Sequence, residues 1–365
     1  MGQSVRLGIL TSGGDCPGLN AAIRGVAKAA YTMGDATVVG IADGYRGLIE
    51  GRARVLDPEE TSGILTRGGT ILGSSREKPF EIRDDESWTD ADEGMDKPEL
   101  IKRNYRELGL DCLVVLGGNG TNTTAARLQE AGLRVIGLPK TIDNDIWGTE
   151  PSFGFHSAVE IATEAIDRLH STATSHNRVM VIELMGHRAG WLALYAGIAG
   201  GGDVLLIPEI PYDPKAITKH LRRRTKEGKA FSIVVVAEGA MSAEEAAMDK
   251  KKRKKLRASM PYPSIGYRVA AEIASSTGME TRVTVLGYLQ RGGVPSPYDR
   301  LLATSFGTAA AELIYGERFG RMVAYRNGAV DSVSLDEVAG KTKRVPVDHE
   351  LVRSARMVGT CLGAE

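Results

Sequence analysis

The chain has 365 residues, 42% of them hydrophobic and 25% charged, a composition typical of a globular protein long enough for two domains. Its 46 basic side chains balance 46 acidic ones, so no overall field attracts nucleic acid or an anionic membrane, and neither is expected as a partner. The three scattered cysteines exclude a zinc pattern and a disulfide framework, and no signal-peptide core or membrane-spanning stretch is recognisable. A cytoplasmic protein is therefore expected.

The first predicted strand, Val5 to Leu10, runs directly into the glycine-rich sequence TSGGDCPGLNAAIRG from Thr11 to Gly25. An alanine-rich helix is predicted from about Asn20. A strand, a glycine-rich turn and a helix in this order aim backbone amides and a helix N-terminus at a phosphate group. The loop matches neither the Walker sequence nor the GxGxxG fingerprint, so a plain tight turn is the alternative.

Two further segments are rich in glycine, and the second also contains small hydroxyl residues. The next predicted strand, Thr37 to Ile41, ends in DGYRG, and RGGTILGSSR follows from Arg67 to Arg76. Arg76 has a planar donor fork suited to phosphate oxygens, although a lone arginine is as often a surface residue. The polar stretch from Glu77 to Pro98 predicts a solvated excursion from the fold that could act as a lid.

A helical pattern resumes near Glu99, and the short apolar strand Cys112 to Leu116 leads into GGNGTNTTA and another helix. The strand predicted from Arg134 to Gly137 then ends in the sequence GLPKTIDNDI, from Gly137 to Ile146. Successive strands thus place three glycine-rich loops and one aspartate loop at their C-terminal ends, which is where ligands bind in doubly wound α/β sheets.

The aspartate loop carries two carboxylates, Asp143 and Asp145, on either side of Asn144. In a turning backbone such a pair can face one site and meet different neighbours, so one could bind a cation while the other handles a proton. A polar turn that caps a strand is the simpler interpretation, because aspartate and asparagine are common turn residues.

Taken in order, these segments resemble the phosphofructokinase family, whose members use ATP or pyrophosphate. The resemblance covers nearly the whole chain and continues in SHNRVMVIELMGHRAGW from Ser175 to Trp191, AEG from Ala237 to Gly239 and TRVTVLGYLQRGGVPSPYDR from Thr281 to Arg300. GGNGT alone is not specific, because NAD kinases and lipid kinases carry a similar GGDGT loop. TIDND followed by LQRGG is specific.

The resemblance implies an α/β fold of two doubly wound domains with mainly parallel sheets and an active site in the cleft between them. The expected donor domain is 1–154 plus about 290–340, and the expected fructose 6-phosphate domain is 155–289 plus about 341–365. A homotetramer is also implied, in which Arg178 and Arg282 reach the 6-phosphate in a neighbouring subunit.

The implied reaction transfers the γ-phosphate of ATP to the 1-hydroxyl of fructose 6-phosphate, giving fructose 1,6-bisphosphate in glycolysis. Asp143 would take the hydroxyl proton, Thr141 would lie by the transferred group, and Asp145 with Asn119 would hold Mg²⁺. Such a transfer needs alignment, a proton acceptor and neutralisation of charge more than covalent chemistry.

The resemblance also implies roles for residues at positions that match the family's binding motifs. Arg76 and the amides of Gly13 and Gly14 are expected to add positive potential around the transferred group. The expected donor-binding residues are Gly13, Gly14, Tyr45, Arg76, Glu77, Gly118, Asn119, Gly120, Thr121, Thr124 and Lys140. The expected sugar-phosphate-binding residues are Thr141, Asp143, Arg178, Met185, Gly186, His187, Glu238, Arg282, Tyr288 and Arg291.

The identity of the donor depends on two positions. Pyrophosphate enzymes of the family usually have aspartate at position 120 and lysine at 140, and bacterial ATP enzymes have glycine at both. Gly120 favours ATP, because a carboxylate there would repel the α-phosphate of a nucleotide. Lys140 can bind either donor and Thr124 replaces a small residue near the nucleotide, so a pyrophosphate-dependent enzyme is the alternative.

Other departures from the family pattern suggest an alternative function of a different class. Asn119 stands where many members have aspartate, Tyr288 where most have histidine and His187 where arginine is common. A catalytically weak, nucleotide-binding regulatory homologue is therefore the second alternative, and the retained Asp143 and Arg291 argue against it.

Regulation and surface charge give two last expectations. Of the basic residues that form the effector pocket in bacterial ATP enzymes, Arg24, Lys28 and Lys229 remain, whereas Pro58, His170 and Glu227 occupy the other positions. Weak regulation by phosphoenolpyruvate or ADP is therefore expected. The run KKKRKK from Lys250 to Lys255 could bind nucleic acid or polyphosphate, but without interleaved aromatic residues a solvated helix or loop is favoured.

Overall fold

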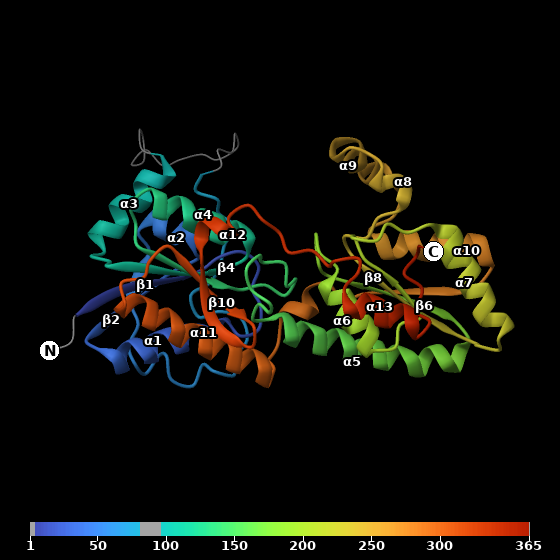
Figure 1. The fold of residues 1–365 in the computed structure, drawn as a ribbon, viewed down its shortest axis with the longest axis horizontal. Helices are drawn as coiled ribbons and strands as arrows, with labels where there is room; N and C mark the ends of the chain where they lie inside the picture. Colours follow the sequence, from blue (N-terminus) through green and yellow to red (C-terminus); the bar gives the residue numbers. More distant parts are fainter. Residues whose placement is uncertain (1–3, 81–95, 365) are drawn as a thin grey trace. The chain divides into compact units, whose positions relative to one another are not determined.

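A computed structural model describes residues 4–80 and 96–364 of the chain. Most of the polar stretch that was predicted to form a lid lies outside these residues. The chain forms two compact units, Met1–Ser157 with Arg291–Lys343 and Ala158–Gln290 with Arg344–Glu365 (Figure 1). None of the helices in the described ranges is long and apolar enough to cross a membrane.

The first unit is built on a sheet that, within the described residues, has seven strands in the order β11-β10-β5-β4-β1-β2-β3. Its strands are β1 (Val5–Thr11), β2 (Ala36–Ile41), β3 (Ala53–Val55), β4 (Cys112–Gly117), β5 (Val135–Pro139), β10 (Arg321–Arg326) and β11 (Ala329–Ser334). The interior pairs are parallel, and only the edge strands β3 and β11 are antiparallel to their neighbours. The strand order reverses between β1 and β4, so the loops after these two strands lie at a topological switch point, where such sheets bind ligands.

Helices cover both faces of this sheet. They are α1 (Leu19–Met33), α2 (Tyr45–Glu50), α3 (Lys97–Glu107), α4 (Asn119–Glu130), α11 (Pro297–Tyr315) and α12 (Leu335–Val338). Helices α1 and α11 pack together on one face, and α2, α3, α4 and α12 lie on the other (Figure 1). The apolar runs VRLGILT and CLVVLG supply the two central strands, which are buried on both faces as parallel strands require.

The second unit has a smaller, all-parallel sheet in the order β7-β8-β6-β9. Its strands are β6 (Val179–Leu184), β7 (Val204–Leu206), β8 (Ser232–Ala237) and β9 (Thr281–Val285). Its helices are α5 (Phe155–His176), α6 (Trp191–Ala199), α7 (Pro214–Lys226), α8 (Ala243–Ala246), α9 (Lys250–Ser259), α10 (Ile265–Thr277) and α13 (Glu350–Met357), with the 3-10 helix η2 (Gly287–Arg291) after β9. Helices α7 and α10 pack on one face, and α6 contacts β7, β8 and α13.

The predicted α/β class with mainly parallel sheets is confirmed, and most predicted elements lie within a few residues of the observed ones. The long helix α5 runs from Phe155 to His176. The lysine run forms the helix α9, in which no residue is buried, so the interpretation as a solvated helix agrees with the structure.

Candidate active site

Two glycine-rich loops of the first unit meet beyond the C-terminal end of β1. The Gly13 amide donates to the Ser75 carbonyl oxygen at 2.8 Å, and the Ser74 hydroxyl donates to the Gly13 carbonyl oxygen at 2.6 Å. The Ser12 amide donates to the carbonyl oxygen of Leu116 in β4 at 3.0 Å. The Gly13 N–H therefore has an acceptor within the fold in this conformation, and the assignment of Gly13 to the donor site stays a prediction.

Two cationic side chains, those of Lys140 and Arg291, converge at Gly14. The Lys140 ammonium donates to the Gly14 carbonyl oxygen, and Arg291 Nη1 donates to the neighbouring Asp15 carbonyl oxygen at 3.0 Å. A Cβ added at Gly14 would lie 2.6 Å from Arg291 Nη1, so only glycine leaves room for the guanidinium. Three residues predicted separately, two for the donor and one for the sugar, are thus brought together.

Lys140 is held at the end of β5 and is almost fully buried. Burial lowers its pKa and the Arg291 charge acts in the same direction, whereas Cys16, Asp15 and Asp143 oppose the shift. Arg291 Nε is also buried and has no hydrogen-bond partner among the described residues. Buried donors are normally paired, so the site has unused capacity for an anionic acceptor.

The metal residues predicted from the resemblance lie in direct contact. The Asn119 side-chain amide, at the start of α4, donates to the Asp145 carboxylate at 2.9 Å and to its carbonyl oxygen at 3.2 Å. Burial and the neighbouring Asp143 raise the Asp145 pKa to about 6, against the effects of Lys343 and Asn119. The Asn119 side-chain oxygen is buried and accepts no hydrogen bond from the described part of the chain.

The turn formed by residues 141–146, called the aspartate turn below, is stabilised by hydrogen bonds within the first unit. Asn144 has the left-handed φ of 51°, which asparagine tolerates better than most residues, and its side-chain oxygen accepts the Ser152 amide at 3.0 Å. The Ser152 hydroxyl donates to the Thr141 carbonyl oxygen at 2.8 Å. The Asp143 amide donates to the Thr141 hydroxyl at 3.1 Å, so the proposed base and its neighbour form one small turn.

Two predicted donor residues are structural in this conformation. Tyr45 is only 1% exposed and donates to the Thr121 carbonyl oxygen at 3.0 Å, so it supports the loop from beneath, and its assignment as a donor contact stays a prediction. Glu77 pairs with Lys97 at 2.9 Å. In contrast, Gly120 is exposed at the start of α4, and an added Cβ would meet no atom within 4 Å.

The remaining predicted donor residues lie around the same loops. Gly118 caps α4, Thr121 and Thr124 are buried within it, and Arg76 is exposed after the loop that contacts Gly13.

In the second unit, five of the predicted sugar residues lie beyond the C-terminal ends of the strands: Met185, Gly186, His187, Glu238 and Tyr288. The Glu238 amide, after β8, donates to the Leu184 carbonyl oxygen of β6 at 2.8 Å, and the Met185 amide donates to the side chain of Gln290 at 3.3 Å. A Cβ at Gly239 would lie 2.5 Å from the His187 carbonyl oxygen. The loops that contain Met185, Gly186 and His187 therefore lie against the Glu238 loop, and Tyr288 is exposed in η2.

Arg178 and Arg282 lie at the opposite end of that sheet. Arg282 is near the start of β9, beside Met180 of β6, and Arg178 immediately precedes β6. Glu280 contacts both guanidinium groups, with its carboxylate 2.9 Å from Arg178 Nε. The structure therefore pairs these two arginines and separates them, by the length of a strand, from Met185 and Glu238 of the same unit.

Comparison with known proteins now identifies the family. The family model described as Phosphofructokinase matches residues 6–314. The chain belongs to the phosphofructokinase family. It is 68% identical over 356 residues to the ATP-dependent 6-phosphofructokinase of Spirochaeta thermophila, with 98% of this chain and 97% of that protein covered. It is 53% identical over 359 residues to ATP-dependent 6-phosphofructokinase 3 of Bacteroides thetaiotaomicron, with 98% and 100% covered.

Solved structures support the same phosphofructokinase fold. A phosphofructokinase of Saccharomyces cerevisiae matches with a TM-score of 0.77 and 29% identity, over 92% of this chain and 45% of the yeast chain. A pyrophosphate-dependent phosphofructokinase from Marinobacter aquaeolei matches with a TM-score of 0.78 and 22% identity, over 98% and 88% of the two chains. The second likeness shows the fold alone and does not bear on the donor.

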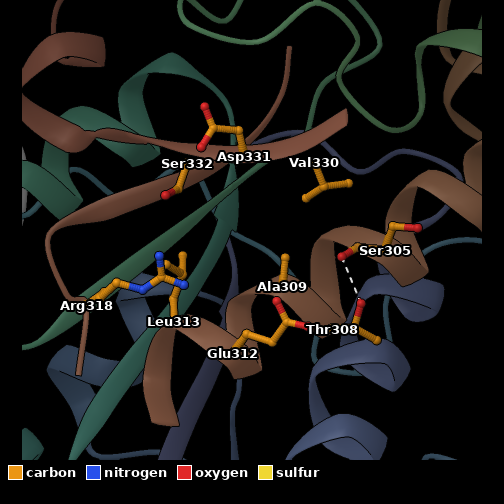
Figure 2. A pocket seen from close by; sticks show the side chains of 9 residues that line it. All are labelled: Ser305, Thr308, Ala309, Glu312, Leu313, Arg318, Val330, Asp331 and Ser332. Atoms are coloured by element: carbon orange, nitrogen blue, oxygen red, sulfur yellow. Dashed lines mark hydrogen bonds between the residues drawn. The ribbon is translucent and has the colours of Figure 1, made fainter. Parts of the chain in front are cut away.

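Two pockets of this phosphofructokinase lie apart from the aspartate turn. One of about 260 Å³ lies between α11 and β11, where acidic, basic and hydroxyl side chains mix, and none of its lining residues was predicted (Figure 2). Another, of about 290 Å³, is lined by Glu238, Glu183 and Arg257, so it adjoins the predicted sugar residues of the second unit.

Lys343 is the residue of the site that sequence reasoning missed. Its ammonium donates to the Asn144 side-chain oxygen at 3.1 Å and to the Thr149 carbonyl oxygen at 2.9 Å. Burial lowers its pKa to about 7, against the charges of Asp145 and Glu150. No local signal marks it, because the Asn144 contact spans 199 positions of sequence.

Proposed function

We propose that the chain is an ATP-dependent 6-phosphofructokinase, which transfers the γ-phosphate of ATP to the 1-hydroxyl of D-fructose 6-phosphate. One observation carries the proposal: Lys140 and Arg291 converge on Gly14 at the end of β1, in the unit that also contains the Asp143 turn. This juxtaposition supplies positive charge for phosphates and a carboxylate for a proton. We assign donor binding to the first unit and sugar binding to the second, in a cytoplasmic glycolytic enzyme.

Each group has a role set by its chemistry. Asp143 accepts the proton of the 1-hydroxyl as the oxygen attacks the phosphorus, and the Thr141 hydroxyl lies beside the transferred group. Lys140 and Arg291 neutralise charge that spreads over the phosphoryl oxygens, together with Arg76. Buried cations act more strongly than exposed ones because less solvent screens them.

Asp143→Asn tests the proposed base. It keeps the size of the side chain and removes the proton acceptor, so we expect kcat to fall by about 10²–10⁴-fold. A coupled assay for fructose 1,6-bisphosphate measures this directly. If the wild-type protein forms no bisphosphate with either ATP or pyrophosphate, the catalytically weak regulatory homologue is the better description.

Mg²⁺ is the implied metal, and the residues present fit it. The buried, unpaired Asn119 side-chain oxygen and the Asp145 carboxylate are oxygen donors of the kind that Mg²⁺ prefers. No cluster of three or more His, Cys, Asp or Glu side chains that could bind a metal occurs within the described ranges. Asn119 and Asp145 would therefore share the ion with phosphate oxygens and water, and when bound it would neutralise phosphate charge.

ATP is proposed as the donor on the basis of Gly120. A Cβ added at position 120 would contact no protein atom, so an aspartate there should leave the protein structure unchanged. Its carboxylate would instead repel the phosphates of the bound donor. We expect Gly120→Asp to reduce kcat/KM for ATP far more than that for pyrophosphate, with Gly120→Ala as the control for size. Initial rates with both donors test this, and full activity of Gly120→Asp with ATP would show that the steric argument is wrong.

A homo-oligomer with shared sugar sites is proposed from the two arginines. Arg178 and Arg282 lie at one end of β6 and β9, and Met185 and Glu238 lie at the other ends of β6 and β8. A strand of six residues spans about 20 Å, which is longer than one sugar phosphate. One chain therefore cannot place both sets on the same molecule, so the arginines would complete the site of a neighbour, as in a tetramer.

Mixing two inactive variants tests shared sites. Asp143→Asn removes the base, and Arg178→Glu with Arg282→Glu removes the phosphate-binding pair. Mixed oligomers contain some sites with the intact aspartate from one chain and intact arginines from the other, so activity should reappear on mixing and reassembly. Light scattering gives the oligomeric state of each sample. If reassembled mixtures stay inactive, the arginines do not act across chains.

A further inference from the structure

Lys343 ties a distant segment to the aspartate turn. Its ammonium donates to the Asn144 side-chain oxygen at 3.1 Å and to the carbonyl oxygens of Thr149 and Glu150. Its own amide donates to the Asp145 carbonyl oxygen at 2.7 Å. Lys343 therefore contacts both Asn144 and Asp145 of the turn. The three N–H donors of its ammonium group match the three oxygen acceptors around it.

Through Asn144, the contact with Lys343 can affect the orientation of Asp143 and Asp145. It separates the two aspartates, has a left-handed φ of 51° and shares its side-chain oxygen between Lys343 and the Ser152 amide, the latter at 3.0 Å. A left-handed residue persists where its surroundings fix it. Releasing the oxygen from one donor would allow the peptide planes on both sides to rotate, and both aspartates would turn with them.

Lys343 also has a particular place in the chain. It is the last residue of the first unit, and Arg344 begins the segment that returns to the second. The end of the donor unit is thus fixed to the turn that carries the proposed base. Buried Ile142 and Ile146 anchor the apolar side of the turn, and Lys343 supplies the hydrogen-bonded anchor on its polar side.

We infer that Lys343 is a positioning residue for phosphoryl transfer, which acts through Asn144 to hold Asp143 and Asp145 in their reactive orientation. The inference rests on the proposed function of these aspartates. Lys343 touches neither substrate in this role, so its removal should impair the chemical step more than substrate binding. Misplacement of a reacting group by about 1 Å can reduce a rate by roughly a hundredfold.

The test compares Lys343→Met with Lys341→Met. Lys341 is exposed in the same segment and lies 5.9 Å from the Trp147 ring centroid, so its variant removes an equal charge without touching Asn144. We expect Lys343→Met to lower kcat about 10- to 100-fold, with KM for both substrates within about threefold, and Lys341→Met to retain wild-type kcat. Lys343→Arg, which keeps charge and donors, should recover more of kcat than Met.

Hydrogen exchange separates failure of this inference from failure of the proposed function. Amides of residues 141–150 should exchange faster in Lys343→Met than in the wild type and in Lys341→Met, whatever reaction the protein catalyses. If exchange is unchanged, or kcat stays within twofold of the wild type, Lys343 does not position the turn. If Lys343→Met fails to fold, the same two measurements on Lys343→Gln, which also removes the charge but keeps a polar end group, decide. If the wild type forms no bisphosphate but exchange rises, the anchor exists and the proposed function is wrong.

Discussion

Asn119→Asp is the substitution that best probes the charge balance of the site. In the wild type, the Asn119 amide donates to the Asp145 carboxylate at 2.9 Å, so the new carboxylate would replace a donor by a like charge. At this distance the repulsion is about 6 kcal/mol for an effective dielectric constant near 20. The pair would instead bind one proton, which costs at most about 4 kcal/mol at pH 7 for a carboxyl group of ordinary pKa.

We therefore expect a loss of roughly 2–4 kcal/mol at pH 7 without metal, because relaxation and water recover part of the repulsion. For a unit of this size that loss corresponds to a fall in Tm of about 5–15 °C. The folded-state pKa of the new pair is raised, so the penalty is absent below the unfolded pKa near 4 and grows as pH rises through the folded value. The Tm difference from wild type should accordingly shrink between pH 7 and pH 5.

Thermal melting with EDTA or Mg²⁺ measures both effects. Mg²⁺ should restore more of the Tm of Asn119→Asp than it adds to the wild type, since two carboxylates attract the ion more strongly than one. Asn119→Ala is the control, because it removes the hydrogen bond without adding charge; it should lose about 1 kcal/mol at pH 7, and this loss should change less with pH than that of Asn119→Asp. A loss in Asn119→Asp that changes with neither pH nor Mg²⁺ would refute the electrostatic reasoning.

Three other expectations follow from the structure. Burial alone would raise the Glu245 pKa, but the hydrogen bond from Arg257 and the other partners of the carboxylate outweigh burial, so the pKa is lowered. Glu245→Gln should therefore reduce the free energy of unfolding, measured with denaturant, by about 1–3 kcal/mol at pH 7. The difference from the wild type should vanish as the pH falls through the folded-state pKa of Glu245. Gly14→Ala should lower kcat about tenfold or more at nearly unchanged Tm, because the methyl group displaces the guanidinium packed over it. Initial-rate curves for fructose 6-phosphate should shift little with phosphoenolpyruvate or ADP, because Pro58, His170 and Glu227 occupy effector positions that are basic in bacterial ATP enzymes.

The fold and the main loops could be predicted from sequence because their signals are local. A buried apolar run followed by consecutive glycines marks a strand end and a close approach of backbone, and the segment around Gly14 shows both. The identity of the aspartate turn also followed from one short motif. Such signals fix which residues gather at a sheet edge.

What a side chain does there depends on partners far away in sequence, and this could not be predicted. The Gly13 amide donates to the Ser75 carbonyl oxygen, and the buried Tyr45 hydroxyl donates to Thr121; no local sequence pattern indicates either contact. Lys343 carries no motif at all. Each of these outcomes depends on contacts between elements that only the folded chain brings together.

The partners of the aspartate turn explain how the chain tolerates asparagine where many family members have aspartate. Asp145 is held by the Asn119 amide and the Lys343 backbone, whereas Asp143 is held through the Thr141 hydroxyl. Because Asn119 donates, it stabilises the Asp145 carboxylate without a metal, but it also leaves the site with one anionic ligand fewer. A free site of this kind attracts Mg²⁺ only weakly, so the ion is expected to enter with the donor phosphates that already bind it. The two aspartates thus depend on different neighbours, and changes at Asn119 should alter metal dependence before they alter proton transfer by Asp143.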